Sequence, residues 1–144
     1  MEYSFEAHKI IGGIGADDEY WRSLENNEFR LPQCAKCGKW TWPAHFRCGD
    51  CGSWDFNWVK LEPEGNIFSW TRSWYAFDRV RERTEDIPYI TVLTEIPEAD
   101  NARILGVLKG DDTGIQIGLP VRGSIEPPSE KTKFYPSITW EIIR

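Results

Sequence analysis

The second half of the chain alternates between apolar and polar residues, and this period of two is typical of strands that bury one face. The alternation is clearest in "PYITVLTEI" and "SITWEII", and "NIFSWTRSWYAF" places its aromatic residues on one parity. The continuously apolar run "ARILGVLKG" is expected of a central strand, and "GLPVRGSIEP" follows it. The residues expected to share buried faces are Phe68, Trp70 and Trp74; Ile90, Val92 and Ile96; and Ile138, Trp140 and Ile142.

These segments are separated by turns rich in Gly, Pro and Asp, and no long helix lies between them. Five to six short strands in this arrangement predict a small barrel or sandwich. A barrel of five strands is an OB-fold, and residues 56–144 have a suitable length for one. We therefore expect an OB-fold domain over residues 56–144. "PPSEKTKFYP" is expected to cross in an extended conformation before the last strand.

The first half begins differently. In "DDEYWRSLENNE", residues 17–28, Tyr20, Trp21 and Leu24 fall on one face at helical spacing, and Asp17 or Asp18 can cap the helix. Residues 1–15 show no clear period, so we expect a flexible lead-in. Their "GGIGADD" lacks the third glycine and the βαβ context of a dinucleotide-binding loop. The lead-in and the helix together account for residues 1–31.

All four cysteines lie in "CAKCGKWTWPAHFRCGDC", as two Cys-x-x-Cys pairs separated by ten residues. Each pair can bring two thiolates to one ion from a tight turn, and a glycine follows each pair where a positive φ suits the turn. Four thiolates complete a tetrahedral zinc site and leave no position open for water. We expect a structural zinc held by Cys34, Cys37, Cys48 and Cys51 in a zinc ribbon over residues 32–55.

Other chemistries fit the cysteines less well. Two structural disulfides need an oxidising compartment, and a thioredoxin-like pair needs one Cys-x-x-Cys in a βαβ pattern. Iron held as in rubredoxin stays open, because tetrahedral sulfur sites accept either metal. His45 lies in the loop but is not needed as a ligand, since four cysteines already complete the site. His8 receives no role.

Aromatic residues are abundant, with eight Trp, seven Phe and five Tyr. Trp40 and Trp42 alternate with polar residues and predict a short strand inside the ribbon. A helix and a ribbon this small cannot bury all their own large aromatics, so some must pack across a boundary. The expected docking residues are Trp21, Trp40, Trp42 and Phe46, with a partner protein preferred over the OB domain.

The net charge and the apolar segments of the chain argue against some classes of function. The net charge of −6 argues against nonspecific nucleic-acid binding, which relies on a positive surface. No apolar run approaches the about 20 residues that span a bilayer, and the N-terminus does not resemble a signal peptide, so we expect a cytoplasmic protein.

The segment "DRVRERTED" carries Arg79, Arg81 and Arg83 among four acids. It is interpreted as a solvated loop of mixed charge or, alternatively, as a loop that contacts anions.

The order of these parts resembles a known family. The helix "DDEYWRSLENNEFRLPQC", the rubredoxin-like ribbon "CAKCGKWTWPAHFRCGDC", and "RILGVLKGDDTGIQIGLPVRGSIEP" are similar to the zinc-ribbon and OB-fold proteins described as acyl-CoA-associated, a domain of unknown function. The resemblance spans about residues 16–143. It implies a mainly β fold with an N-terminal helix, a rubredoxin-like zinc ribbon and a five-stranded OB-fold barrel. It also implies zinc at the four cysteines.

Members of that family are partners of thiolase-like and aldolase-like enzymes. The resemblance therefore implies a non-catalytic accessory subunit that scaffolds the partner and helps to position acyl-CoA. No catalytic residue carries over from the family. The sequence agrees, because no cysteine remains as a nucleophile and neither histidine has an evident orienting partner.

The main alternative is an OB-fold module that binds single-stranded nucleic acid by stacking bases on aromatic side chains. Trp70, Trp74 and Tyr75 are the candidates for such a platform. That mode also needs a basic groove, which the acidic composition disfavours. An electron carrier like rubredoxin is a third possibility, but it would not need the long β domain.

Overall fold

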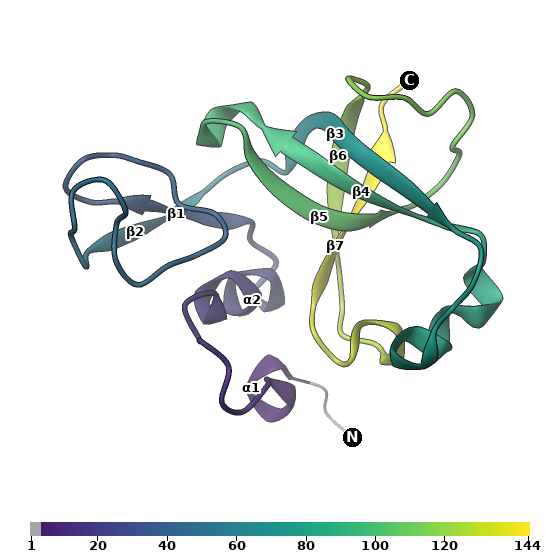
Figure 1. Cartoon of the computed structure of the whole chain (residues 1–144), viewed down its shortest axis with the longest axis horizontal. Coiled ribbons are helices and arrows are strands. Elements are labelled where there is room, and N and C mark those ends of the chain that lie inside the picture. The colour runs from purple at the N-terminus through teal and green to yellow at the C-terminus, as the bar shows by residue number, and fades with distance from the viewer. Residues whose placement is uncertain (1–3) are drawn as a thin grey trace.

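The computed structural model describes residues 4–144, so the first three residues of the lead-in lie outside the described part of the chain. The chain folds into a small two-stranded sheet with long loops and a separate barrel, with two short helices beneath them (Figure 1). The small sheet pairs β1 (Arg30–Cys34) with β2 (Phe56–Lys60) in antiparallel register. Nearly all of the cysteine segment therefore lies between these two strands.

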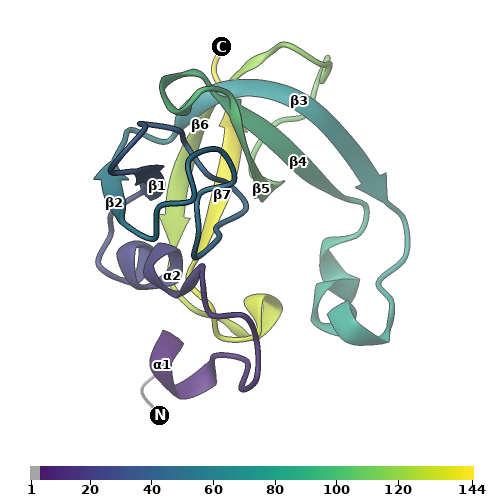
Figure 2. The ribbon, with the colours of Figure 1, turned by 60° about the vertical axis from the view of Figure 1, so that its left-hand side comes forward.

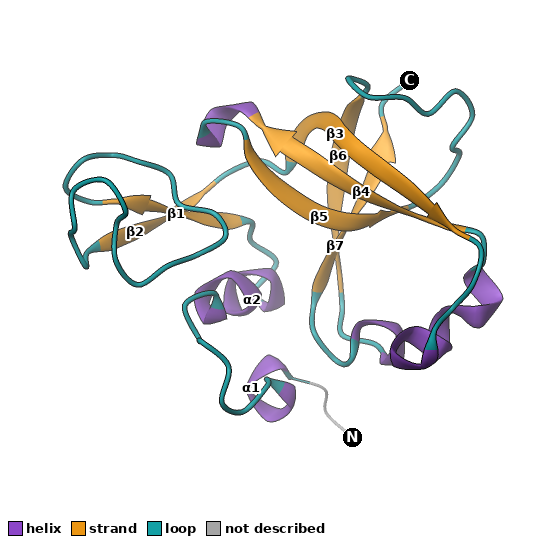
Figure 3. Cartoon of the chain, viewed as in Figure 1, coloured by secondary structure: helices purple, strands orange, loops and turns teal. Residues whose placement is uncertain are grey.

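The barrel is closed and has the strand order β3-β4-β5-β7-β6 (Figure 3). β5 and β7 pair in parallel and all other neighbours are antiparallel. This is the OB-fold arrangement, so the predicted fold class is confirmed. The strands are β3 (Glu64–Ser73), β4 (Tyr89–Ile96), β5 (Ala102–Leu108), β6 (Pro120–Glu126) and β7 (Ser137–Ile142).

The barrel core contains the residues that alternate in the sequence. In β4, every second residue from Ile90 to Ile96 is buried, and β7 shows the same pattern from Ile138 to Ile142. Trp140 is fully buried, and the predictions for both strands are confirmed. Each such large apolar side chain stabilises the fold by about 1.5–3 kcal/mol through its removal from water.

The prediction for β3 is wrong in its details. Ile67, rather than Phe68, enters the core, because a β-bulge between Ile67 and Ser69 shifts the register against β4. A bulge adds one residue to one strand and so interrupts the period of two. Trp70, beyond the bulge, packs against the core, whereas Trp74 lies past the end of β3 and is exposed.

The N-terminal segment is more ordered than expected. Residues Phe5–His8 form the short helix α1, and Phe5 is buried. Its ring meets the edge of Tyr135 with centroids 5.2 Å apart, and its backbone N–H donates to Glu25 Oε2 at 2.6 Å. Contacts with residues far along the chain thus order a segment that shows no periodicity of its own.

The predicted helix is present but shorter. α2 spans Asp18–Glu25, and it ends before Glu28 because Asn27 adopts a positive φ of 59°. Asp17 lies at the N-cap position, but its side chain does not cap the backbone. Its carboxylate instead accepts a hydrogen bond from the indole of Trp21.

The long connections contain short 3-10 helices. η1 (Asp78–Asp86) joins β3 to β4, η2 (Pro97–Ala99) joins β4 to β5, and η3 (Glu130–Thr132) lies between β6 and β7. The predicted extended crossing of residues 127–136 is therefore wrong, since Ser129 and Thr132 form a capping box around η3. Figure 2 shows β3 and β4 reaching past the other strands to carry η1. Within residues 4–144, no helix has the length and apolar character needed to cross a bilayer.

Candidate metal centre and ligand cleft

The two Cys-x-x-Cys turns have the same backbone geometry. The N–H of Gly38 donates to Cys34 O at 2.9 Å, and the N–H of Gly52 donates to Cys48 O at 3.0 Å. Both glycines have positive φ, 79° and 77°, as the sequence predicted. Cys34 N–H donates to Lys39 O, and Cys48 N–H donates to Ser53 O, in each case at 2.8 Å. Two equivalent turns thus present their sulfurs to one point.

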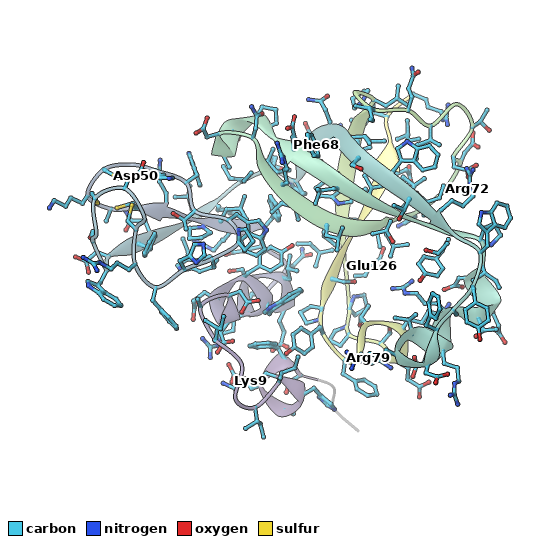
Figure 4. The ribbon with its side chains drawn as sticks, viewed as in Figure 1. Lys9, Asp50, Phe68, Arg72, Arg79 and Glu126 are labelled. Carbon is cyan, nitrogen blue, oxygen red and sulfur yellow. The ribbon has the colours of Figure 1, made fainter. Side chains whose placement is uncertain are left out.

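The four sulfur atoms lie within 4.8 Å of one another, between the loops of the small sheet (Figure 4). Cys34 Sγ is 3.5 Å from Cys51 Sγ, and Cys37 Sγ is 3.6 Å from Cys48 Sγ. Sulfurs about 2.3 Å from a tetrahedral zinc ion lie about 3.8 Å apart, so these distances fit that geometry. All four cysteines are free of disulfides.

The backbone favours thiolates at the first cysteine of each turn. The N–H groups of Cys37 and Lys36 lower the pKa of the Cys34 thiol to about 6, and those of Cys51 and Asp50 lower the pKa of Cys48. The pKa of Cys37 is raised to about 12. The N–H of Lys39 lowers it, but desolvation and the neighbouring sulfurs outweigh that effect. Four negative sulfurs at this spacing repel one another unless a cation lies between them.

The histidines lie outside this cluster. Among the described residues, the cluster of potential metal ligands consists of the four cysteines alone, and His45 is exposed in the loop between the two turns. His8 Nδ1 lies 3.0 Å from Ser4 O, and its ring lies 4.6 Å from that of Phe134.

The predicted docking aromatics separate into two groups. Trp21, Trp40 and Trp42 are partly buried and pack against the core of this same chain, whereas Phe46 is 54% exposed. Trp40 and Trp42 do not form a strand, because within residues 4–144 their one ladder contact is an isolated bridge between Trp40 and Gln33. The three tryptophans thus contribute to the packing of their own chain. Docking of a partner on any of the four aromatic residues stays a prediction.

A cleft of about 850 Å³ lies between the barrel and the N-terminal elements. Its floor is the outer face of β4 and β5, with Leu93, Leu105 and Val107. In OB-folds this face, formed by the second and third strands, is where ligands bind between the flanking loops. The volume lies in the range of cavities that hold small molecules and cofactors, about 300–1,000 Å³.

The two ends of the cleft differ in chemistry. On one side, α2 and the ribbon loop contribute Tyr20, Trp21, Trp42 and Pro43. On the other side, η1 and η3 contribute the positively charged Arg83 and Lys131 among small polar residues. α2 and η1 lie on opposite sides of the molecule in both Figure 1 and Figure 2.

Ion pairs hold the charged end together. Lys131 Nζ lies 2.7 Å from Asp86 Oδ1, Arg83 Nη1 lies 3.8 Å from Asp86 Oδ2, and Lys133 Nζ lies 2.9 Å from Glu82. η1, which is interrupted by non-helical backbone at Val80, is thus bound to η3, and most charges of the predicted mixed-charge loop are paired. Figure 4 shows Arg79 on η1, and no ion pair involving it occurs among the described residues.

Most of the cleft residues are missed by the sequence analysis. They come from α2, the ribbon loop, β4, β5, β6, β7 and the 3-10 helices η1 and η3, and none forms a recognisable motif. The lining residues that the sequence analysis named are Tyr20, Trp21, Trp42, Arg83 and Ile138, each for another role. The predicted OB-fold itself was the available signal, because its second and third strands are its usual binding face.

The proposed stacking platform is only partly present. Trp70 packs against the barrel core with the guanidinium of Arg72 5.4 Å from its ring, so its faces are not free for a base. Trp74 and Tyr75 are exposed, and Tyr75 pairs edge-on with Phe77 at 5.0 Å. The exposed aromatics lie on the connection to η1, outside the cleft.

Comparison with known proteins supports the ribbon and the fold. Residues 21–56 match the family model described as the ChsH2, rubredoxin-like zinc ribbon domain. No curated protein sequence matches the chain.

Two solved structures have the same overall fold. One is described as an Ltp2-ChsH2(DUF35) aldolase. Its matching chain has a TM-score of 0.74 and 20% identity, and the match covers 92% of this chain and 98% of that chain. The other is a protein of unknown function from the DUF35 family of Sulfolobus solfataricus. It has a TM-score of 0.60 and 18% identity, with 96% and 93% covered. The resemblance stated from the sequence, a zinc-ribbon and OB-fold protein, is confirmed.

Proposed function

We propose that this chain, which has a ChsH2-type zinc ribbon and the fold of DUF35 proteins, is a non-catalytic accessory subunit of an acyl-CoA-processing complex. Its partner is a thiolase-like or aldolase-like protein, and the chain helps to position acyl-CoA. The likeness to a chain of an Ltp2-ChsH2(DUF35) aldolase supports the class of partner.

The cleft is the observation that supports acyl-CoA. An acyl thioester of CoA joins an apolar acyl chain to a linker and a phosphate-bearing nucleotide. The cleft offers an apolar floor and aromatic side chains on one side, and Arg83 and Lys131 on the other. Arginine and lysine are the side chains that bind phosphate, and apolar walls favour the acyl part.

We further propose that Cys34, Cys37, Cys48 and Cys51 hold one structural zinc ion. A site of four cysteines leaves no open position for substrate, so the ion stabilises the ribbon rather than acting on acyl-CoA. Iron would fit the same sulfurs, and elemental analysis of purified protein decides between the two.

The partner supplies the catalytic groups in this proposal. Thiolase and aldolase chemistry needs a nucleophile or a placed base, and the four cysteines are assigned to the metal. His45 is exposed on the ribbon loop, and neither histidine lines the cleft.

Co-expression tests the proposal. The chain is produced with a thiolase-like or aldolase-like protein encoded beside it, and the complex is isolated by size-exclusion chromatography with light scattering. We expect a stable complex that cleaves or condenses acyl-CoA, while the isolated chain shows no turnover. Turnover by the isolated, contaminant-free chain, or failure to form a complex with any such protein, contradicts the accessory role.

The nucleic-acid alternative has one observation in its favour, the exposed Trp74, Tyr75 and Phe77 before η1. Bases stack on such side chains with about 1–3 kcal/mol each. A fluorescence anisotropy titration with a labelled single-stranded oligonucleotide at several salt concentrations discriminates the two functions. Tight, salt-sensitive binding would favour the alternative over the acyl-CoA proposal.

A further inference from the structure

A second cavity of about 420 Å³ lies beside the cleft. Residues 10–18 contribute much of its wall, together with Ala44 and Tyr135. The two cavities share three lining residues, Trp21, Trp42 and Pro43. These three side chains therefore form the boundary between the two spaces.

Trp21 is fixed at this boundary by contacts on several sides. Its indole Nε1 donates a hydrogen bond to Asp17 Oδ2 at 3.1 Å. Its ring meets Tyr20 edge-on at 4.8 Å and Tyr135 edge-on at 5.1 Å, measured between centroids. A half-buried indole with these contacts occupies one orientation rather than sampling many, so it is a fixed wall.

The polarity of the two spaces sets the direction in which acyl-CoA would lie. The second cavity is lined by Asp17 and Asp18, which disfavour phosphate, and by Ile10 and Ile14. Three cations line the cleft, Arg83, Lys131 and Arg103, and each also has a carboxylate partner. Two of the three lie on the η1 and η3 side. The phosphate-bearing part is thus favoured at η1 and η3, and the end of the acyl chain points toward Trp21.

From this arrangement we propose that Trp21 sets the length of acyl chain that the cleft accepts, because its indole separates the cleft from the second cavity. This proposal rests on the proposed function, since it assigns the cleft to acyl groups. Trp21 is a specificity-determining residue that contacts the far end of the chain. Asp17 is a positioning residue that acts through the hydrogen bond to the indole.

The test measures binding against chain length. Saturated free fatty acids of increasing length, and the matching acyl-CoAs, are titrated into the full chain by isothermal calorimetry. In the wild-type protein we expect affinity to rise about fourfold for each buried methylene, the equivalent of about 0.8 kcal/mol, and then to stop rising at a limiting length. In Trp21→Ala the rise should continue past that limit, because the second cavity becomes accessible.

Two further variants separate specificity from folding. Trp21→Phe keeps an aromatic ring against Tyr135 but is smaller, so its limit should lie between those of wild type and Trp21→Ala. Asp17→Ala should extend the limit by releasing the indole. Trp54→Ala is the matched control, because Trp54 is 68% exposed and lines neither cavity. Circular dichroism and melting curves establish that each variant is folded.

An unchanged limiting length in folded Trp21→Ala and Trp21→Phe overturns the proposal, as does a wild-type protein that binds no fatty acid or shows no limit. The free fatty acids keep this test apart from that of the proposed function. If the limiting fatty-acid length depends on Trp21 but the chain neither binds CoA nor forms a partner complex, the length selection is retained and the accessory role is rejected. If the complex turns over acyl-CoA but the limiting length does not depend on Trp21, the accessory role is retained and the length selection is rejected.

Discussion

The ring of Tyr20 on α2 lies 4.6 Å from the ring of Trp42 in the ribbon loop, measured between centroids. Tyr20 is fully buried, and burial raises the pKa of its hydroxyl. This contact joins the helix to the ribbon. It gives Trp42 a place in the packing of its own chain, and the partner contact expected from the sequence stays a prediction.

The first prediction concerns that contact. Trp42→Ala should lower the free energy of unfolding by about 2 kcal/mol, less than for a fully buried tryptophan because the side chain is only partly buried. Urea denaturation followed by tryptophan fluorescence measures the change. If Trp42→Ala leaves the unfolding midpoint unchanged and weakens the partner complex instead, Trp42 is a docking residue after all.

The second prediction concerns Phe46, the exposed member of the same set. Phe46→Ala should change stability by less than about 0.5 kcal/mol, as is usual for surface positions. If Phe46 is a central contact of the partner interface, its truncation should cost about 2 kcal/mol of binding, which is roughly a thirtyfold loss of affinity. Calorimetric titration with the partner checks it. Unchanged affinity in Phe46→Ala would remove Phe46 from the interface.

The third prediction concerns the metal. Cys48→Ser should lose the zinc and disorder residues 32–55, because structural zinc contributes about 10–16 kcal/mol in small zinc-binding peptides. The barrel should keep its fold, since its strands pair with one another and not with β1 or β2. Elemental analysis and amide hydrogen exchange report the two parts separately. A full equivalent of tightly bound zinc in Cys48→Ser would show that the ligand assignment is wrong.

That experiment also tests the proposed division into residues 1–31, 32–55 and 56–144. Amide hydrogens in the ribbon should exchange faster with solvent, while those in the barrel should stay protected. Loss of protection throughout the chain would mean that ribbon and barrel unfold as one cooperative unit. The contact between Tyr20 and Trp42 would favour that outcome, because it joins the helix to the ribbon.

The fourth prediction concerns the close approach of β3 and β4. A Cβ atom added at Gly65 would lie 1.9 Å from the carbonyl oxygen of Glu95, which is backbone and cannot move aside without opening the barrel. Gly65→Ala should therefore destabilise the barrel by about 3 kcal/mol, the upper range for overpacking. Gly49→Ala is the control, because nothing lies within 4 Å of its added Cβ. Equal melting temperatures for the two variants would argue against this close approach.

The sequence alone determined the features that depend on neighbouring residues. Each Cys-x-x-Cys-Gly turn forms its own backbone hydrogen bonds, so the spacing was sufficient to predict that the four sulfurs would converge. The alternation of apolar and polar residues in β4 and β7 predicted which of their faces are buried, because side chains alternate between the two faces of any strand. The strand number and the absence of long helices then led to the barrel.

Only the tertiary structure decided the features that depend on distant residues. The bulge between Ile67 and Ser69 reverses the expected face of Phe68, and the pairing of β3 with β4, a separate segment of the chain, defines it. Phe5 is buried by Tyr135, which is 130 residues further along the sequence. Trp21 and Trp42 meet Leu105 and Lys131 around one cleft only after the ribbon, helix and barrel have packed together. No local pattern encodes such a meeting, because the interaction that selects each residue comes from another part of the chain.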